Sequence, residues 1–199
     1  MEPLNKERKA ALADSISLVP DPKRPMGFQV KRTKRSRFSE ELLLRMALRD
    51  SAPRSGNLDV RILAEGDSWC NLLYPISGYP KTLVDVLSED YYTVNLGWPG
   101  DTFEKILREQ QDRYKQALQA NTFDYFILSA GGNDFFTALA KFTRRADQGG
   151  SSTDPKDYIK PEFDRFLTTI AGWYRGVARQ VTTWTTRTTL LLHGYDYAI

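Results

Sequence analysis

Cysteine and histidine are the scarcest reactive residues in this sequence, because the 199 residues include one of each, Cys70 and His193. A single cysteine excludes an intrachain disulfide and a four-cysteine zinc site. Cys70 follows Ser68 by two residues, a spacing that would suit a reactive thiol. Free cysteines are more often small buried hydrophobic residues, so we expect Cys70 to be buried and unreactive.

Long hydrophobic runs are also lacking. No stretch of about 18 uncharged apolar residues occurs, and the N-terminal segment MEPLNKERKAALADS has no apolar region of the kind that a secretory signal needs. We therefore expect a cytoplasmic protein. The hydrophobic content of 41% is still sufficient for one sizeable core, and a chain of this length favours one domain.

Charge is distributed unevenly along the chain. Residues 1–58 contain 13 Lys and Arg against 7 Asp and Glu, whereas residues 59–199 contain 15 against 18. The run KRTKRSR has the charge to attract nucleic acid or an anionic membrane surface, but without interleaved aromatic residues we favour a solvated tail. The segment VPDPKRP rules out a continuous helix. We predict a basic arm over 1–58, poorly ordered or surface-draped over 1–36 and with a short helix at about 40–49, followed by a domain over 59–199.

From residue 59 onward, strand-like apolar runs alternate with helical patterns. We predict strands at 59–65, 91–96, 124–130 and 188–193, and helices at 79–90, 100–120 and about 161–182. Pro80 is expected to begin the first of these helices, and Asp101 and Glu104 have the spacing of a capping box for the second. Because parallel strands need long crossovers, this alternation predicts an α/β fold with an open, doubly wound parallel sheet.

The loops that follow three of these strands are rich in glycine and polar residues. Ligands in such sheets bind outside the carboxyl ends of the strands. Glycine permits sharp turns and close backbone approach, and each loop opens toward a helix whose free N–H groups favour an anion. The loops are GDSW at 66–69, GWPGD at 97–101 and GGND at 131–134.

Together these loops predict an anion-stabilising pocket beside the hydroxyl of Ser68. That combination suits acyl transfer, in which a serine oxygen attacks a carbonyl and the developing oxyanion meets donors placed in advance. The main-chain N–H groups of Ser68 and Gly100 and the side-chain amide of Asn133 are the candidate donors. An amide at position 133 supplies a neutral donor where a carboxylate would repel the oxyanion.

Three short blocks, EGDSW, NLGWPGDT and SAGGND, each follow a predicted strand. In this order they resemble the SGNH hydrolase superfamily, also called GDSL esterases and lipases, although Trp69 stands where leucine is common. Over about residues 59–199 the resemblance implies a three-layer, flavodoxin-like fold. It also implies Ser68 as the nucleophile, Gly100 and Asn133 in the oxyanion hole, and a small-molecule, lipid or carbohydrate ester as substrate, with no cofactor and no metal.

The fourth block of that superfamily, Asp-x-x-His, supplies the general base and is missing from this sequence. His193 precedes Asp196 in the order His-x-x-Asp instead. One hypothesis is that the domain is C-terminally incomplete and belongs to a longer enzyme; the other is that His193 is a substitute base. We favour the first, because the strand order usual in the superfamily would put a strand between His193 and Ser68.

Other functions are compatible with the same residues. Asp67, Asp101 and Asp134 at three strand ends would hold Mg²⁺ in a phosphotransferase or phosphatase, unless they serve as loop and cap acceptors. A non-catalytic module could keep the pocket without the base, and a flavodoxin-like domain could hold a phosphate ester at the glycine loops. Trp69 and Trp98 either line the pocket or belong to the core.

Overall fold

A computed structural model describes residues 16–20, 28–32, 50–51, 57–72, 81–145 and 152–194. In chain order, its elements are β1 (Ile16–Pro20), β2 (Phe28–Arg32), β3 (Asp50–Ser51), β4 (Asn57–Gly66), α3 (Leu83–Asp90), β5 (Tyr91–Asn95), α4 (Phe103–Lys105), the π-helical turn η1 (Ile106–Gln110), α5 (Gln111–Ala120), β6 (Tyr125–Ser129), α6 (Gly132–Phe142), the 3₁₀ turn η2 (Pro155–Tyr158), α7 (Glu162–Trp184) and β7 (Thr189–His193).

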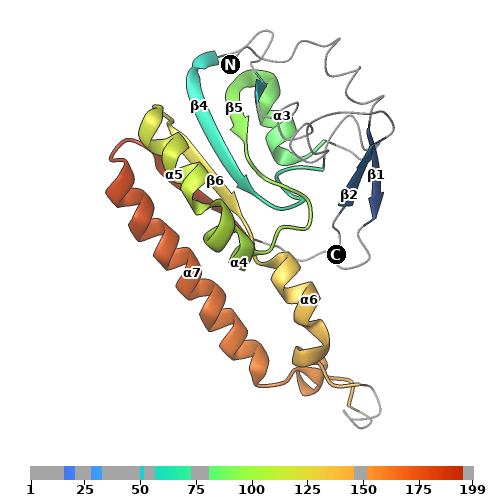
Figure 1. Ribbon diagram of the computed structural model, residues 1–199. Coiled ribbons are helices and arrows are strands. Elements are labelled where there is room, and N and C mark those ends of the chain that lie inside the picture. The colour runs from blue at the N-terminus through green and yellow to red at the C-terminus, as the bar shows by residue number, and fades with distance from the viewer. Residues whose placement is uncertain are drawn as a thin grey trace.

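The main sheet has the strand order β3-β5-β4-β6-β7. Strands β5, β4 and β6 are labelled in Figure 1. Strands β5, β4, β6 and β7 are all parallel, and β3 adds two antiparallel residues at the edge beside β5. Strands β1 and β2 form a second, antiparallel sheet. The predicted α/β fold with a parallel sheet is therefore confirmed.

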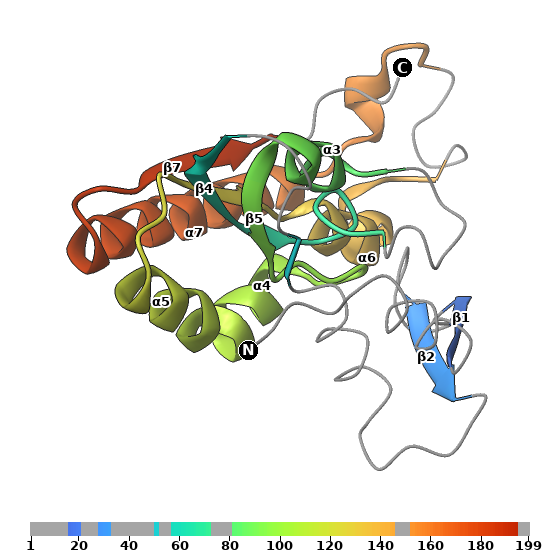
Figure 2. The same ribbon diagram turned by 90° about the horizontal axis from the view of Figure 1, so that it is seen from above.

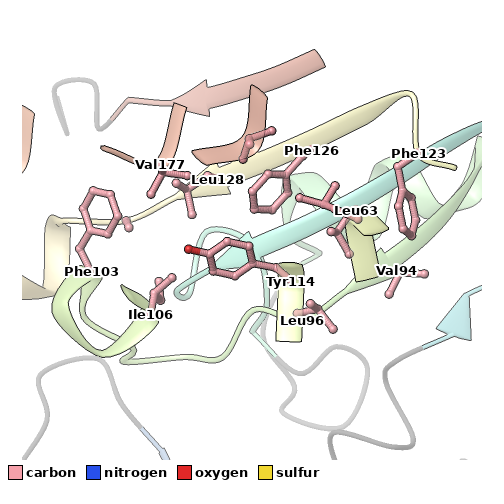
Figure 3. Close-up of a cluster of buried hydrophobic side chains, with 13 residues drawn as sticks. Leu63, Val94, Leu96, Phe103, Ile106, Tyr114, Phe123, Phe126, Leu128 and Val177 are labelled. Atoms are coloured by element: carbon pink, nitrogen blue, oxygen red, sulfur yellow. The ribbon is translucent and has the colours of Figure 1, made fainter. Parts of the chain in front are cut away.

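Apolar side chains cover both faces of the sheet, because successive residues of a strand point to opposite sides. On β4, Leu63 joins one cluster, whereas Ile62 and Ala64 join the other. Helices α5 and α7 pack on the Leu63 face, and α3 packs on the opposite face (Figure 2). The larger cluster, in which side chains from the sheet and the helices point toward one another, is drawn in Figure 3.

Two helices begin differently from the prediction. Helix α3 starts at Leu83 rather than at Pro80, because Thr82 caps it in a reciprocal capping box with Asp85. The next helix is capped by Thr102, whose side chain accepts a hydrogen bond from the main-chain N–H of Lys105 at 3.2 Å. The predicted capping box of Asp101 and Glu104 is therefore wrong.

The N-terminal segment is described only in part. The predicted helix at about 40–49 lies outside the described residues. Strands β1 and β2 lie within 1–36, where no strand was predicted, and β3 joins the main sheet from within the predicted arm. In the part of the chain that the structure describes, no helix has the length and apolar character needed to cross a membrane.

Candidate active site

The three glycine-containing loops leave the sheet at one edge, as expected for parallel strands. The ends of β4, β6 and β7 are in register, because Gly66 pairs with Ser129 and Ser129 pairs with His193. Ser68 follows β4 by two residues, and Asn133 follows β6 by four. This edge therefore holds the loops that the sequence identified as the candidate site.

The first loop is a compact turn built around Asp67. Its main-chain carbonyl accepts hydrogen bonds from the N–H groups of Cys70 and Asn71, both at 3.0 Å. Its carboxylate accepts the N–H of Trp69 at 3.1 Å, an Asx turn. Ser68 lies within this turn and is half-buried, and its hydroxyl has no hydrogen-bond partner among the described residues.

The second loop is held against the first. The N–H of Trp98 donates to the carbonyl of Gly66 at 2.9 Å, and the side-chain amide of Asn71 donates to the carbonyl of Gly97, also at 2.9 Å. Gly100 then takes a left-handed conformation with φ of 81°, which a residue with a side chain rarely adopts. Gly100 therefore sits in a turn that needs glycine, three residues before the start of α4.

The third loop is tied to the second by side chains of α6. Asn133 is 4% exposed, and its amide nitrogen donates to the carbonyl of Asp101 at 2.9 Å. The carboxylate of Asp134 accepts the main-chain N–H of Phe103 at 2.6 Å and so caps α4. Since an amide carries two N–H donors, the bond from Asn133 fixes its orientation and leaves one donor for a ligand.

The three aspartates of these loops make local contacts. Asp67 and Asp134 accept loop and cap hydrogen bonds, and the buried carboxylate of Asp101 pairs with the amine of Lys105 at 2.7 Å. Burial raises the pKa of Asp134, and the hydrogen bonds from main-chain N–H groups oppose that rise. No group of three potential metal ligands occurs among the described residues, so the geometry gives the magnesium hypothesis no support.

His193 lies at the end of β7, and β6 separates its strand from β4, as expected from the usual strand order. Its Nδ1 atom is 3.0 Å from the hydroxyl oxygen of Ser129. Its ring centroid is 5.4 Å from that of Trp69. Within the described residues no hydrogen bond joins His193 to Ser68. His193 instead contacts Ser129 and Trp69, and Trp69 is the residue next to the candidate nucleophile.

Tyr174 of α7 also supports the site, a role that no sequence motif indicates. Its hydroxyl donates to the carbonyl of Ala130 at 2.7 Å and accepts the N–H of the same residue at 3.2 Å. Burial raises the pKa of Tyr174 to about 12. Tyr174 thereby holds the backbone just before the third glycine loop, although 44 residues separate it from Ala130.

The remaining candidates divide between core and surface. Trp98 is 2% exposed and belongs to the core, whereas Trp69 is 52% exposed at the edge of the site. Cys70 is 1% exposed, and burial together with the charges of Asp67 and Glu65 raises its pKa. The prediction of a buried cysteine is confirmed, and the raised pKa disfavours the reactive thiolate.

Comparisons with known proteins add little to this geometry. No protein-family model and no curated protein matches the chain. A crystal structure described as a "putative GDSL-like lipase" from Parabacteroides merdae is similar over 70% of this chain and 61% of its own, with 16% identity and a TM-score of 0.39. The chain thus spans less than two thirds of that structure. A TM-score below 0.5 supports no conclusion about activity, so we infer the function from the site.

Proposed function

We propose that this protein is a serine ester hydrolase that acts on an acyl or acetyl ester through Ser68. One observation carries the proposal: hydrogen bonds link the loops after β4, β5 and β6, and these loops contain Ser68, Gly100 and Asn133. The links are Trp98 to Gly66, Asp67 to Ser129, and Asn133 to Asp101. Donors held in place before the reaction are what oxyanion stabilisation requires.

In the proposed reaction, the oxygen of Ser68 attacks the ester carbonyl and the carbonyl oxygen becomes an oxyanion. The N–H groups of Ser68 and Gly100 and the free N–H of Asn133 stabilise that charge. The C–O bond to the alcohol then breaks, and the alcohol leaves with the proton taken from Ser68. Water hydrolyses the resulting acyl-serine, which releases the acid and restores the hydroxyl.

The proton transfers in this scheme need a general base. We propose that a residue outside these 199 supplies it, because His193 contacts Ser129 and is one strand removed from Ser68. The competing hypothesis is that His193 reaches Ser68 when substrate is bound. Its ring contact with Trp69, the neighbour of Ser68, favours that hypothesis.

A second candidate function is a non-catalytic module that binds acyl or carbohydrate ligands in the same pocket. The contact between His193 and Ser129 favours it, because a histidine engaged in this way does not activate Ser68. A protein of this kind would bind an ester without forming an acyl-serine.

The proposal also covers the layers of the fold and the division of the chain into a domain and an arm. We propose a doubly wound, three-layer domain over 59–199, supported by the helices on both faces of the sheet, and a basic arm over 1–58 that meets an anionic partner. A cytoplasmic location is part of this proposal.

Hydrolysis of p-nitrophenyl acetate and butyrate by the complete protein, which includes the proposed general base, tests the function. We expect Ser68→Ala to abolish turnover, and Asn133→Ala to lower kcat by about 10²- to 10³-fold, because one oxyanion donor is lost. Ser88→Ala is the matched control, since the hydroxyl of Ser88 only donates to the carbonyl of Asp85 within α3. Wild-type rates in both Ser68→Ala and Asn133→Ala would refute the assignment.

The same assay decides between the hypotheses for the base. His193→Asn lowers kcat by about 10²- to 10⁴-fold if His193 is the general base, and leaves it unchanged if the base lies elsewhere. Circular dichroism of the variant is the control, because His193 also contacts Ser129.

A further inference from the structure

A cavity of about 530 Å³ lies beside β5, apart from the glycine loops. Its walls come from β4, β5, α5 and the segment before β6. Its described lining residues are Arg61, Tyr92, Val94, Leu96, Arg113, Gln116, Ala117, Ala120, Asn121 and Phe123. Cavities that bind small molecules have volumes of about 300–1,000 Å³, so this one is large enough for an organic ligand.

Arg61 is the distinctive residue of this cavity. Its guanidinium lies 4.9 Å from the centroid of the Tyr92 ring and 5.6 Å from that of Phe123, so two aromatic rings hold it in place. Its main-chain N–H donates to the carboxylate of Asp124 at 2.7 Å. Among the described residues, the guanidinium itself has neither an ion pair nor a hydrogen bond.

The rest of the lining strengthens the preference for an anion. Arg113 of α5 adds a second cation, and its guanidinium contacts the amide oxygen of Gln110 at 3.4 Å. The amides of Gln116 and Asn121 add hydrogen-bonding groups, and no described lining residue is Asp or Glu. Val94 and Leu96 supply an apolar wall. The cavity therefore combines two cations with an apolar surface.

We propose that this cavity binds an organic anion, with a phosphate or carboxylate group paired to Arg61 and an apolar body against Val94 and Leu96. A guanidinium presents five N–H donors in a planar fork that matches both kinds of oxyanion. The two rings hold that fork in position, so little side-chain entropy is lost when the anion binds. Arg61 lies in the first half of β4 and Ser68 follows its other end, so this site is separate from the ester site.

Isothermal titration calorimetry of the full chain tests this proposal. The probes are phenylphosphonate and benzoate, which distinguish a phosphate-like from a carboxylate ligand, and benzyl alcohol serves as the neutral control. We expect at least one anion to bind and benzyl alcohol not to bind. Arg61→Gln should weaken anion binding by about tenfold or more, because the charge-assisted hydrogen bonds are lost.

A second variant keeps the test independent of Arg61. Gln116→Glu places a carboxylate on the exposed helical wall of the cavity, and we expect it to weaken anion binding by about tenfold through repulsion. Gln119→Glu makes the same change on α5 at an exposed position outside the described lining, and should leave affinity unchanged. If Arg61→Gln does not fold, the two glutamate variants decide the question.

Three results would overturn the proposal: no binding of either anion at millimolar concentration, equal affinity in wild type and Gln116→Glu, or binding of benzyl alcohol as tight as that of the anions. None of these results bears on ester hydrolysis, because the proposal does not depend on Ser68.

Discussion

At the scale of single residues, Gly66 is a position in the described part of the chain that has no room for a side chain. A Cβ atom there would overlap the carbonyl oxygen of Ser129 and approach the sulfur of Cys70 to 2.8 Å. The carbonyl belongs to a paired strand and the sulfur to a buried side chain, so neither moves easily. The glycine before Asp67 is thus needed to let β4 end against β6.

We predict that Gly66→Ala lowers the free energy of unfolding by more than about 2 kcal/mol, because the paired strands must separate to admit the methyl group. Gly172→Ala is the matched control, since nothing lies within 4 Å of its Cβ position in α7. It should raise the free energy of unfolding by about 0.5–1 kcal/mol through helix propensity. Urea denaturation measures both, and equal stability of the two variants would contradict the prediction.

The sequence could identify some residues of the candidate site but not others. Ser68, Gly100 and Asn133 occur in short blocks directly after predicted strands, so local pattern was enough to propose them. Ser129 and Tyr174 could not be found in that way. The contact of Ser129 with His193 depends on strand register, and that of Tyr174 depends on how α7 packs against the sheet.

At the scale of elements, the π-helical turn η1 connects α4 with α5 and has a structural role at the site. Gln110, its last residue, is 3% exposed and donates its side-chain amide to the buried carboxylate of Asp101. Lys105 contacts the other oxygen of the same carboxylate at 2.7 Å. Turns of this kind are often found at functional sites, and here the turn helps to hold the residue whose carbonyl orients Asn133.

We predict that Gln110→Leu lowers the free energy of unfolding by about 2 kcal/mol, because a hydrogen bond to a buried charge is lost. Gln119→Leu is the control, since Gln119 is exposed on α5, and it should change stability by less than about 0.5 kcal/mol. Thermal unfolding of both variants checks this. A Gln110→Leu protein as stable as the control would show that η1 does not support Asp101.

The four parallel strands were predictable to within about two residues because strands buried on both faces contain runs of apolar residues, as in β4 and β6. The bounds of the helices were less predictable. The wide turn at η1 leaves no mark in the apolar pattern, which continues through it from Phe103 to Leu118. The start of α3 was also missed, because Pro80 and Thr82 both signal a helix start and hydrogen bonding favours the threonine.

At the scale of the whole molecule, the candidate active site and the cationic cavity lie at different parts of the main sheet. The loops with Ser68, Gly100 and Asn133 lie at the carboxyl edge of the sheet. The cationic cavity lies along β5 and involves the first half of β4. The alternation of strands and helices was sufficient to predict parallel pairing. It did not predict that β3 would join the edge, because two residues have no periodicity to detect.

The most direct test of the proposed function is exposure of the complete protein, which includes the proposed general base, to a fluorophosphonate, followed by intact-mass measurement and peptide mapping. We predict a single adduct on Ser68, forming about 10²- to 10³-fold more slowly in Asn133→Ala, because the oxyanion donor is lost. Comparison with His193→Asn then shows whether this histidine activates the serine. Absence of an adduct on Ser68 under conditions that label a known serine hydrolase, or equal labelling of wild type and Asn133→Ala, would contradict the assignment.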